Sequence, residues 1–198
     1  MTGADTATFA TRRRGDLFDS LLRLMLDEGF AHLGIADIAG RLHCSKSTLY
    51  TLADSKEQLV TRTVTHFFRT ATEQVEAQVG DAASARDRIT GYLVAVGDAL
   101  APASEAFMTD LNAFTPTREL YERNTAAAAR RVRDWIAGGV ASGEFRDVDA
   151  GFAADLAASM MSRIQRREVA TATGLDDAHA YRQLAAILTT GIVATPEV

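Results

Sequence analysis

The chain has 198 residues, a formal net charge of −5 and 47% hydrophobic residues. This composition is typical of a globular protein and excludes a disordered chain, and no apolar run approaches the roughly 20 residues that span a bilayer. The N-terminus lacks the apolar core of a secretory signal, and the single cysteine, Cys44, has no partner for an internal disulfide. The chain is therefore expected to be cytoplasmic.

Every strongly periodic segment of the sequence has the period of an α-helix, and no segment alternates as a strand does. The chain contains only three prolines, which also favours helix. In chain order, the first four expected helices are one that ends at Gly29, one over 35–42, one that begins at Ser45 and one over 56–79. They are followed by one that ends before Pro102, a short one around Phe107 to Phe114, one from Thr115 to Gly143, and two over about 149–172 and 177–193. The predicted fold class is all-α, with about nine helices.

The segment 35–52, IADIAGRLHCSKSTLYTL, is typical of a helix-turn-helix motif. Two short helices are joined by about three residues, and the apolar residues of both helices face inward. The opposite face of the second helix is polar and rich in hydrogen-bond donors, as a DNA-reading helix requires. That face carries Lys46, Ser47, Thr48, Tyr50 and Thr51. The alternative is an ordinary helical hairpin with a solvated polar face.

The region from Arg14 to Leu59 resembles the N-terminal domain of the TetR/AcrR transcriptional regulators. The resemblance extends over about 45 residues without gaps and rests on several spaced pairs and triplets: Gly29-Phe30, Ile38-Ala39, Ser45-Lys46, Thr48-Leu49-Tyr50 and Ser55-Lys56-Glu57. It implies a three-helix DNA-binding domain over 1–57, with the helix-turn-helix at about 34–52. Residues 58–198 would form a larger helical domain that binds a ligand and dimerises.

The resemblance also implies roles for individual residues. Ser45 matches the cap of the recognition helix, and the next three residues match its DNA-facing first turn. Tyr50 and Lys56 match residues that contact phosphates. Arg14, with its two preceding arginines, matches only loosely, and Arg41 is either a DNA contact or a solvated arginine. The predicted DNA-binding residues are Arg14, Arg41, Ser45, Lys46, Ser47, Thr48, Tyr50, Thr51 and Lys56.

Two departures from the family pattern affect the DNA-binding domain. His43 stands where the family usually has glycine, although histidine tolerates left-handed dihedral angles better than most residues. Leu52-Ala53-Asp54 stands where His-Phe-Pro is frequent, which removes a phosphate donor and adds an acid. Residues 1–60 hold seven basic and eight acidic side chains, so the DNA affinity of one monomer is expected to be modest. Dimerisation should therefore be needed.

The C-terminal region resembles the TetR-type ligand-binding and dimerisation domains more weakly. By that likeness the last two helices of each subunit pair across a two-fold dimer interface, for which we predict Phe152, Ala153, Leu156, Ala157, Met160, Leu184 and Leu188. About half of these residues are expected to pack inside one subunit instead. A pocket for a lipophilic small molecule is predicted among the middle helices, lined by Phe107, Met108, Leu111, Asn112, Phe114, Tyr121 and Trp135.

The expected function is that of a homodimeric, ligand-responsive repressor that binds a pseudo-palindromic operator in double-stranded DNA. The sequence does not favour an enzyme, because its four histidines are scattered and no nucleophile or phosphate-loop motif is present. We therefore predict no catalytic residue, no metal site and no cofactor. The alternative function is a helical small-molecule binder or carrier whose DNA-reading surface has degraded.

Overall fold

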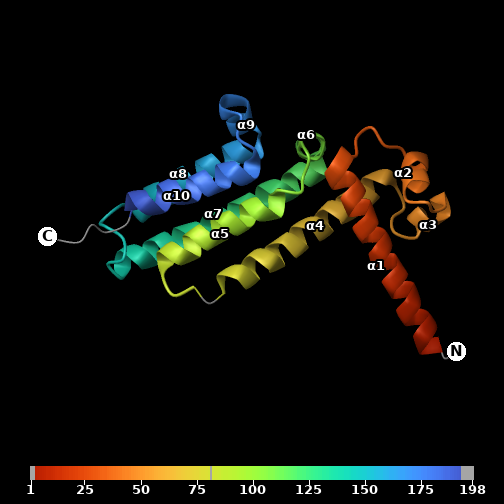
Figure 1. Ribbon diagram of the computed structural model, residues 1–198, viewed down its shortest axis with the longest axis horizontal. Helices are drawn as coiled ribbons and strands as arrows, with labels where there is room; N and C mark the ends of the chain where they lie inside the picture. Colours follow the sequence, from red (N-terminus) through yellow and green to blue (C-terminus); the bar gives the residue numbers. More distant parts are fainter. Residues whose placement is uncertain (1–2, 81, 193–198) are drawn as a thin grey trace. The chain divides into compact units, whose positions relative to one another are not determined.

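The computed structural model describes residues 3–80 and 82–192, with side chains from residue 15 onward. In this part of the chain there are ten α-helices and no strand, which confirms the predicted all-α class (Figure 1). The helices are α1 Gly3–Glu28, α2 Ile35–Arg41, α3 Lys46–Tyr50, α4 Lys56–Val79, α5 Ala85–Leu100, α6 Glu105–Ala113, α7 Thr115–Ala141, α8 Ala150–Gln165, α9 Glu168–Thr173 and α10 Asp177–Ile192.

The additional helix arises from a break in the segment 149–172, which was expected to be one helix. Arg167 has a positive φ of 63° and separates α8 from α9. Its Nη1 donates a hydrogen bond of 2.8 Å to Oδ1 of Asp177, which is buried at the start of α10. A left-handed residue that is neither Gly nor Asn is unfavourable, so the pairing with a buried carboxylate offsets a conformational cost. The sequence carried no turn signal at this position.

The described chain divides into two compact units. The first unit consists of residues up to 67 together with 103–118, and the second consists of 68–102 together with the residues from 119 onward. The boundary between units therefore falls inside the continuous helices α4 and α7. The predicted boundary between residues 57 and 58 separates the chain by function, into a DNA-binding domain and a ligand-binding domain, and not by compactness. It stays a prediction.

The core of the first unit is centred on α6. Phe107 of α6 is fully buried, and its ring meets those of Phe30 and Phe67 edge to face, with centroids 6.0 and 5.8 Å away. Two further α6 residues, Met108 and Leu111, are buried beside it. The helix therefore packs against α1 and the first half of α4 and completes the hydrophobic core of the N-terminal unit.

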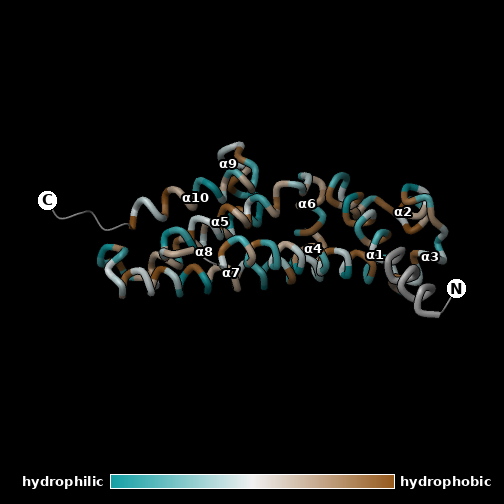
Figure 2. Tube along the Cα trace, turned by 60° about the horizontal axis from the view of Figure 1, so that its bottom comes forward, coloured by the Kyte–Doolittle hydropathy of each residue, from teal (hydrophilic) through white to brown (hydrophobic). Residues whose placement is uncertain are grey.

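In the second unit, α5 and α10 pack closely against each other, and α8 lies beside α10 (Figure 1). Gly97 permits the close approach of α5, because a Cβ atom there would lie only 3.0 Å from the carbonyl oxygen of Ala178 and 3.1 Å from Cβ of Tyr181. Figure 2 shows hydrophobic and hydrophilic residues alternating along the helices, as expected of amphipathic helices around a core. Among the described residues, no helix is long and apolar enough to cross a membrane.

Candidate DNA-binding surface and ligand cavity

Helices α2 and α3 form the predicted helix-turn-helix. Ile38 of α2 and Leu49 of α3 are buried at the contact between the two helices, and Leu52 is buried directly after α3. His43 lies in the connecting turn and has a positive φ of 49°. It therefore adopts the left-handed conformation for which the family usually has glycine at this position. The backbone N–H of Cys44 then donates to the carbonyl oxygen of Ala39 at 2.9 Å, which ends α2.

The first turn of α3 is held by the hydroxyl group of Ser45. Its Oγ accepts a hydrogen bond of 3.1 Å from the N–H of Thr48 and lies 2.7 Å from Oγ of Ser47 and 2.8 Å from Oγ1 of Thr48. Ser45 is therefore the N-cap of α3, as predicted. The side chains of Lys46 and Ser47 remain exposed. They form a polar surface at the N-terminal end of α3.

Tyr50 and Thr51 extend this polar surface at the C-terminal end of α3. The Tyr50 side chain is half exposed although it is large and aromatic, and Thr51 is exposed as well. The Thr51 hydroxyl donates to the carbonyl oxygen of Thr48 at 2.6 Å. The six predicted residues from Ser45 to Thr51 other than Leu49 therefore lie on one short helix and its caps. We call this set, Ser45, Lys46, Ser47, Thr48, Tyr50 and Thr51, the α3 polar face.

The three other predicted DNA-binding residues lie outside the α3 polar face. Arg41 forms an ion pair with Glu28, at the end of α1. Lys56, the first residue of α4, donates from Nζ to the carbonyl oxygen of Ala31 at 2.9 Å. The side chain of Arg14 lies outside the described residues. Both described cations therefore have a partner within the protein, so each must leave or share that partner to bind a phosphate.

The seven residues predicted to bind a ligand do not form one cavity. Phe107, Met108 and Leu111 belong to the buried core of the first unit, and Phe114 lies 6.5 Å from Phe30, centroid to centroid. Asn112 donates from Nδ2 to the carbonyl oxygen of Met108 at 2.9 Å. Trp135 packs edge to face against Tyr92, with ring centroids 5.2 Å apart. The sequence placed these residues together because it could not show that α6 returns to the N-terminal core.

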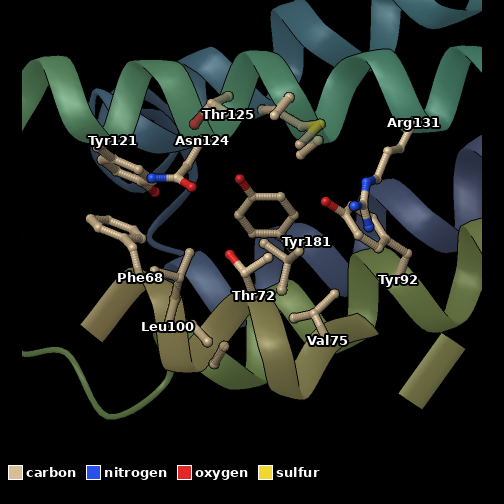
Figure 3. Close-up of a pocket in the computed structure, with 16 residues that line it drawn as sticks. Phe68, Thr72, Val75, Tyr92, Leu100, Tyr121, Asn124, Thr125, Arg131 and Tyr181 are labelled. Atoms are coloured by element: carbon tan, nitrogen blue, oxygen red, sulfur yellow. The ribbon is translucent and has the colours of Figure 1, made fainter. Parts of the chain in front are cut away.

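A cavity of about 110 Å³ lies within the second unit, and Tyr121 is the one residue among the seven that lines it. Helices α4, α5, α7, α8 and α10 contribute its walls. Figure 3 shows Phe68 and Thr72 of α4 facing Tyr121 and Thr125 of α7 across the cavity. The lining is mostly aromatic and aliphatic, and four aromatic side chains take part: Phe68, Tyr92, Tyr121 and Tyr181. The cavity therefore has the apolar walls that small-molecule sites usually have.

The polar groups around the cavity are few. Burial raises the pKa of all three tyrosines that line it, most strongly for Tyr121 and Tyr181. Their phenol groups are consequently neutral at physiological pH. Arg131 lies at the cavity beside Tyr92 and donates to Oε1 of Glu76 at 2.6 Å, so its charge is paired (Figure 3).

The residues predicted for a dimer interface fall into two groups. Ala153, Ala157, Leu184 and Leu188 are buried within the chain itself, as was expected for about half of the set. The remaining three lie on one face of α8: Phe152 is 71% exposed, Leu156 is 54% exposed and Met160 is half-buried. Ile187 of α10, which the sequence analysis did not select, is also 71% exposed. The sequence feature that could have indicated Ile187 is its position as an apolar residue next to the buried face of α10.

No group of three or more His, Cys, Asp or Glu side chains in the described part of the chain could hold a metal ion. Cys44 is a free thiol, half-buried in the turn of the helix-turn-helix.

Comparison with known proteins identifies the N-terminal region. Residues 17–63 match the family model of bacterial regulatory proteins of the tetR family. No curated protein sequence matches the chain. The matched residues cover α2, α3 and the flanking parts of α1 and α4, and so contain the whole helix-turn-helix.

Solved structures share the fold over nearly the whole chain. A putative transcriptional regulator from Saccharomonospora viridis, solved in complex with choline, has a TM-score of 0.74 and 20% identity, covering 93% of this chain and 100% of its own. The TetR family regulator PfmR from Thermus thermophilus has a TM-score of 0.64 and 18% identity, covering 88% and 97%. The ketosteroid transcriptional regulator KstR2 of Mycobacterium tuberculosis has a TM-score of 0.63 and 20% identity, covering 92% of this chain and 96% of its own.

The family match and the helix-turn-helix geometry agree on the same residues. Residues 17–63 therefore match the tetR family of bacterial regulatory proteins, and the chain as a whole shares the fold of solved TetR family regulators.

Proposed function

We propose that this protein is a homodimeric, ligand-responsive repressor that binds a pseudo-palindromic operator and releases it when a small molecule occupies the cavity of the second unit. The observation that carries the proposal is the α3 polar face, which presents Lys46, Ser47 and Tyr50 to solvent on a helix capped by Ser45. Short hydroxyl side chains reach base edges in the major groove, whereas a cation and a tyrosine bind phosphates. The match of residues 17–63 to the tetR family supports the same interpretation.

The exposed apolar side chains of α8 and α10 support the dimer. Phe152, Leu156 and Ile187 are large hydrophobic residues with more than half of their surface exposed, on two helices that pack against each other. The segment before α8 is hydrogen-bonded to the end of α10: the N–H of Arg146 donates to the carbonyl oxygen of Ile192. An exposed apolar patch of this kind marks an interaction surface, and a second copy of the chain would cover it by two-fold symmetry.

The continuity of α4 supports ligand control of DNA binding. This single helix begins at Lys56, next to the helix-turn-helix, and its later turns supply Phe68, Thr72 and Val75 to the cavity. A rigid helix that contributes to both sites can transmit a tilt from one to the other. A coupling of about 1–3 kcal/mol would change DNA affinity roughly 5–150-fold. The choline complex of the Saccharomonospora viridis regulator supports small-molecule binding by this fold.

A second candidate function is a small-molecule carrier without DNA binding. The observation that favours it is the charge of the DNA-binding domain: Arg41 and Lys56 have partners within the protein, and Asp54 adds an acid after the recognition helix. The repressor explains the exposed donors of α3, which a carrier would not need. Sequence-specific DNA binding separates the two functions.

We expect Lys46→Ala to weaken binding to all DNA sequences alike and to reduce the slope of log K against log salt concentration by about one per binding site. The reason is that one phosphate contact per recognition helix is lost. Fluorescence anisotropy over a series of salt concentrations measures both quantities. Arg123→Ala removes an exposed cation from α7 and is the matched control, for which the slope stays unchanged.

An unchanged salt slope for Lys46→Ala would contradict the proposed role of α3. By contrast, Ser47→Ala is expected to alter the preferred base sequence with little effect on the slope, because its hydroxyl is uncharged and would face base edges.

A further inference from the structure

Two hydroxyl groups of the cavity have no hydrogen-bond partner. Oη of Tyr121 and Oγ1 of Thr125 are both buried, and the two residues are 3% and 6% exposed. The phenol groups of Tyr121 and Tyr181 are close enough to shift each other's pKa, but no hydrogen bond of normal geometry reaches Oη of Tyr121. Tyr121 and Thr125 lie one turn apart on α7, on the face that lines the cavity (Figure 3).

A buried polar group without a partner destabilises the folded chain, because it has lost its hydrogen bonds to water. Two such groups, one turn apart on the face of α7 that lines the cavity, would each gain a hydrogen-bond partner if a polar molecule filled it. The apolar part of the wall, which includes Phe68 and Leu100, has no hydrogen-bonding group to offer.

We infer that the effector is an uncharged molecule of about the size of a single six-membered ring, whose one hydroxyl or carbonyl oxygen binds Tyr121 and Thr125. This inference rests on the proposed function, since it names the chemical class of the ligand for the same cavity. The ring contacts the aromatic and aliphatic walls. The oxygen function accepts a hydrogen bond from the phenol of Tyr121 and exchanges a second one with the Thr125 hydroxyl.

The charge of the lining argues for a neutral ligand. Aromatic rings attract cations, but no Asp or Glu that could pair with a cation is among the described residues that line the cavity. An anion gains little from Arg131, because Glu76 already pairs with it. A charged ligand would therefore lose its hydration without a compensating partner.

The volume sets the size of the ligand. An apolar cavity of about 150 Å³ in another protein accommodates benzene. The cavity here is smaller, at about 110 Å³, but it is partly open to solvent, so a monocyclic compound can occupy it with one edge at the opening, whereas a multi-ring compound would need rearrangement. Phenol has the size and the single hydroxyl group that the site requires, so it is the probe.

The test is calorimetric titration of the full chain with phenol, benzene, benzoate and choline, without DNA. We expect phenol to bind at least about tenfold more tightly than each of the other three. Tyr121→Phe and Thr125→Val each remove one hydroxyl at nearly constant shape, and each should weaken phenol binding about tenfold while leaving benzene binding unchanged. Thr72→Val is the matched control, because its hydroxyl lines the cavity but is exposed, and phenol affinity should not change.

Thermal unfolding of the ligand-free variants separates a ligand-binding role from a structural one. Tyr121→Phe and Thr125→Val should unfold at the same temperature as the parent or higher, since an unpartnered hydroxyl contributes no stability. A lower unfolding temperature would show that the hydroxyl groups have structural partners and would overturn the inference.

Four binding results would also overturn it: tighter binding of benzene, of benzoate or of choline than of phenol, or no binding of any probe, which would mean that water fills the cavity. The proposed function fails separately. If phenol binds through both hydroxyls but does not change operator affinity, the ligand class stands and ligand control of DNA binding does not.

Discussion

Replacement of Phe107 by alanine is expected to lower the free energy of unfolding of the first unit by about 3–5 kcal/mol. The side chain is fully buried, and its ring lies between those of Phe30 and Phe67. Truncation leaves a cavity that this rigid aromatic cluster cannot close. Operator binding should be lost with it, because Phe30 directly precedes the segment that leads into α2 and the helix-turn-helix.

Denaturant unfolding, followed by circular dichroism, measures the effect of Phe107→Ala. Phe114→Ala is the matched control: this phenylalanine also contacts Phe30 but is only half-buried, so its truncation should cost clearly less. If Phe107→Ala instead kept its stability and lost only ligand affinity, the residue would belong to a ligand pocket, as the sequence analysis expected, and the assignment of α6 to the N-terminal core would be wrong.

Replacement of Asp110 by alanine is expected to destabilise the same unit by about 2–4 kcal/mol, since a hydrogen bond to a charged group contributes roughly 1.5–3 kcal/mol. Oδ2 of this α6 carboxylate accepts hydrogen bonds from the backbone N–H groups of Phe30 and Ala31, at 2.6 and 2.7 Å. Those N–H groups lie in the turn after α1, where Gly29 has a φ of 78°. The carboxylate therefore fixes the turn that leads to the helix-turn-helix.

Asp110→Asn keeps one acceptor oxygen at nearly the same shape and loses only the charge, so it should be destabilised less than Asp110→Ala. Gly29→Ala should resemble Asp110→Ala, because its Cβ atom would lie 2.6 Å from Oδ2 of Asp110 and the positive φ disfavours alanine. Urea unfolding of the three variants tests this order. A stability of Asp110→Ala within about 0.5 kcal/mol of the parent would show that the turn does not depend on the carboxylate.

The helix-turn-helix could be predicted because its signals are local. The apolar spacing through Ile38 and Leu49, the cap at Ser45 and the tolerance of His43 for a positive φ all lie within one short segment. The start of α4 is also fixed locally, because Ser55 Oγ accepts a hydrogen bond from the N–H of Gln58 and the Gln58 side chain accepts one from the N–H of Asp54.

The cavity of the second unit could not be predicted because it depends on packing between helices that are distant in sequence. Tyr92, Tyr121 and Tyr181 come from α5, α7 and α10, and only Tyr121 was selected. Periodicity predicted that the apolar residues of α6 are buried, but it could not show whether they pack in the core of the first unit or of the second. The break at Arg167 was equally invisible, since its cause is a pairing with Asp177 that forms only in the folded chain.

For a related reason, the sequence could not separate the exposed from the buried residues among those predicted for a dimer interface. Sequence periodicity identifies the apolar stripe of a helix but not which part of that stripe its own subunit covers. Ala157 and Leu188 turned out to be buried by the chain itself, whereas Phe152 and Leu156 remain exposed. The alanines of the predicted stripe pack inside the chain, whereas the large side chains beside them on α8 stay exposed.

The central claim, that two copies of this chain read DNA through α3, is tested most directly by footprinting. The full-length protein selects duplexes from a random-sequence pool, and the selected DNA is then footprinted with the parent and with Lys46→Ala. The account predicts two half-sites related by two-fold symmetry, about one helical turn or slightly more apart, protected together and at a higher protein concentration for the variant. Selection of no common sequence, or protection of a single half-site by a stable monomer, would contradict it.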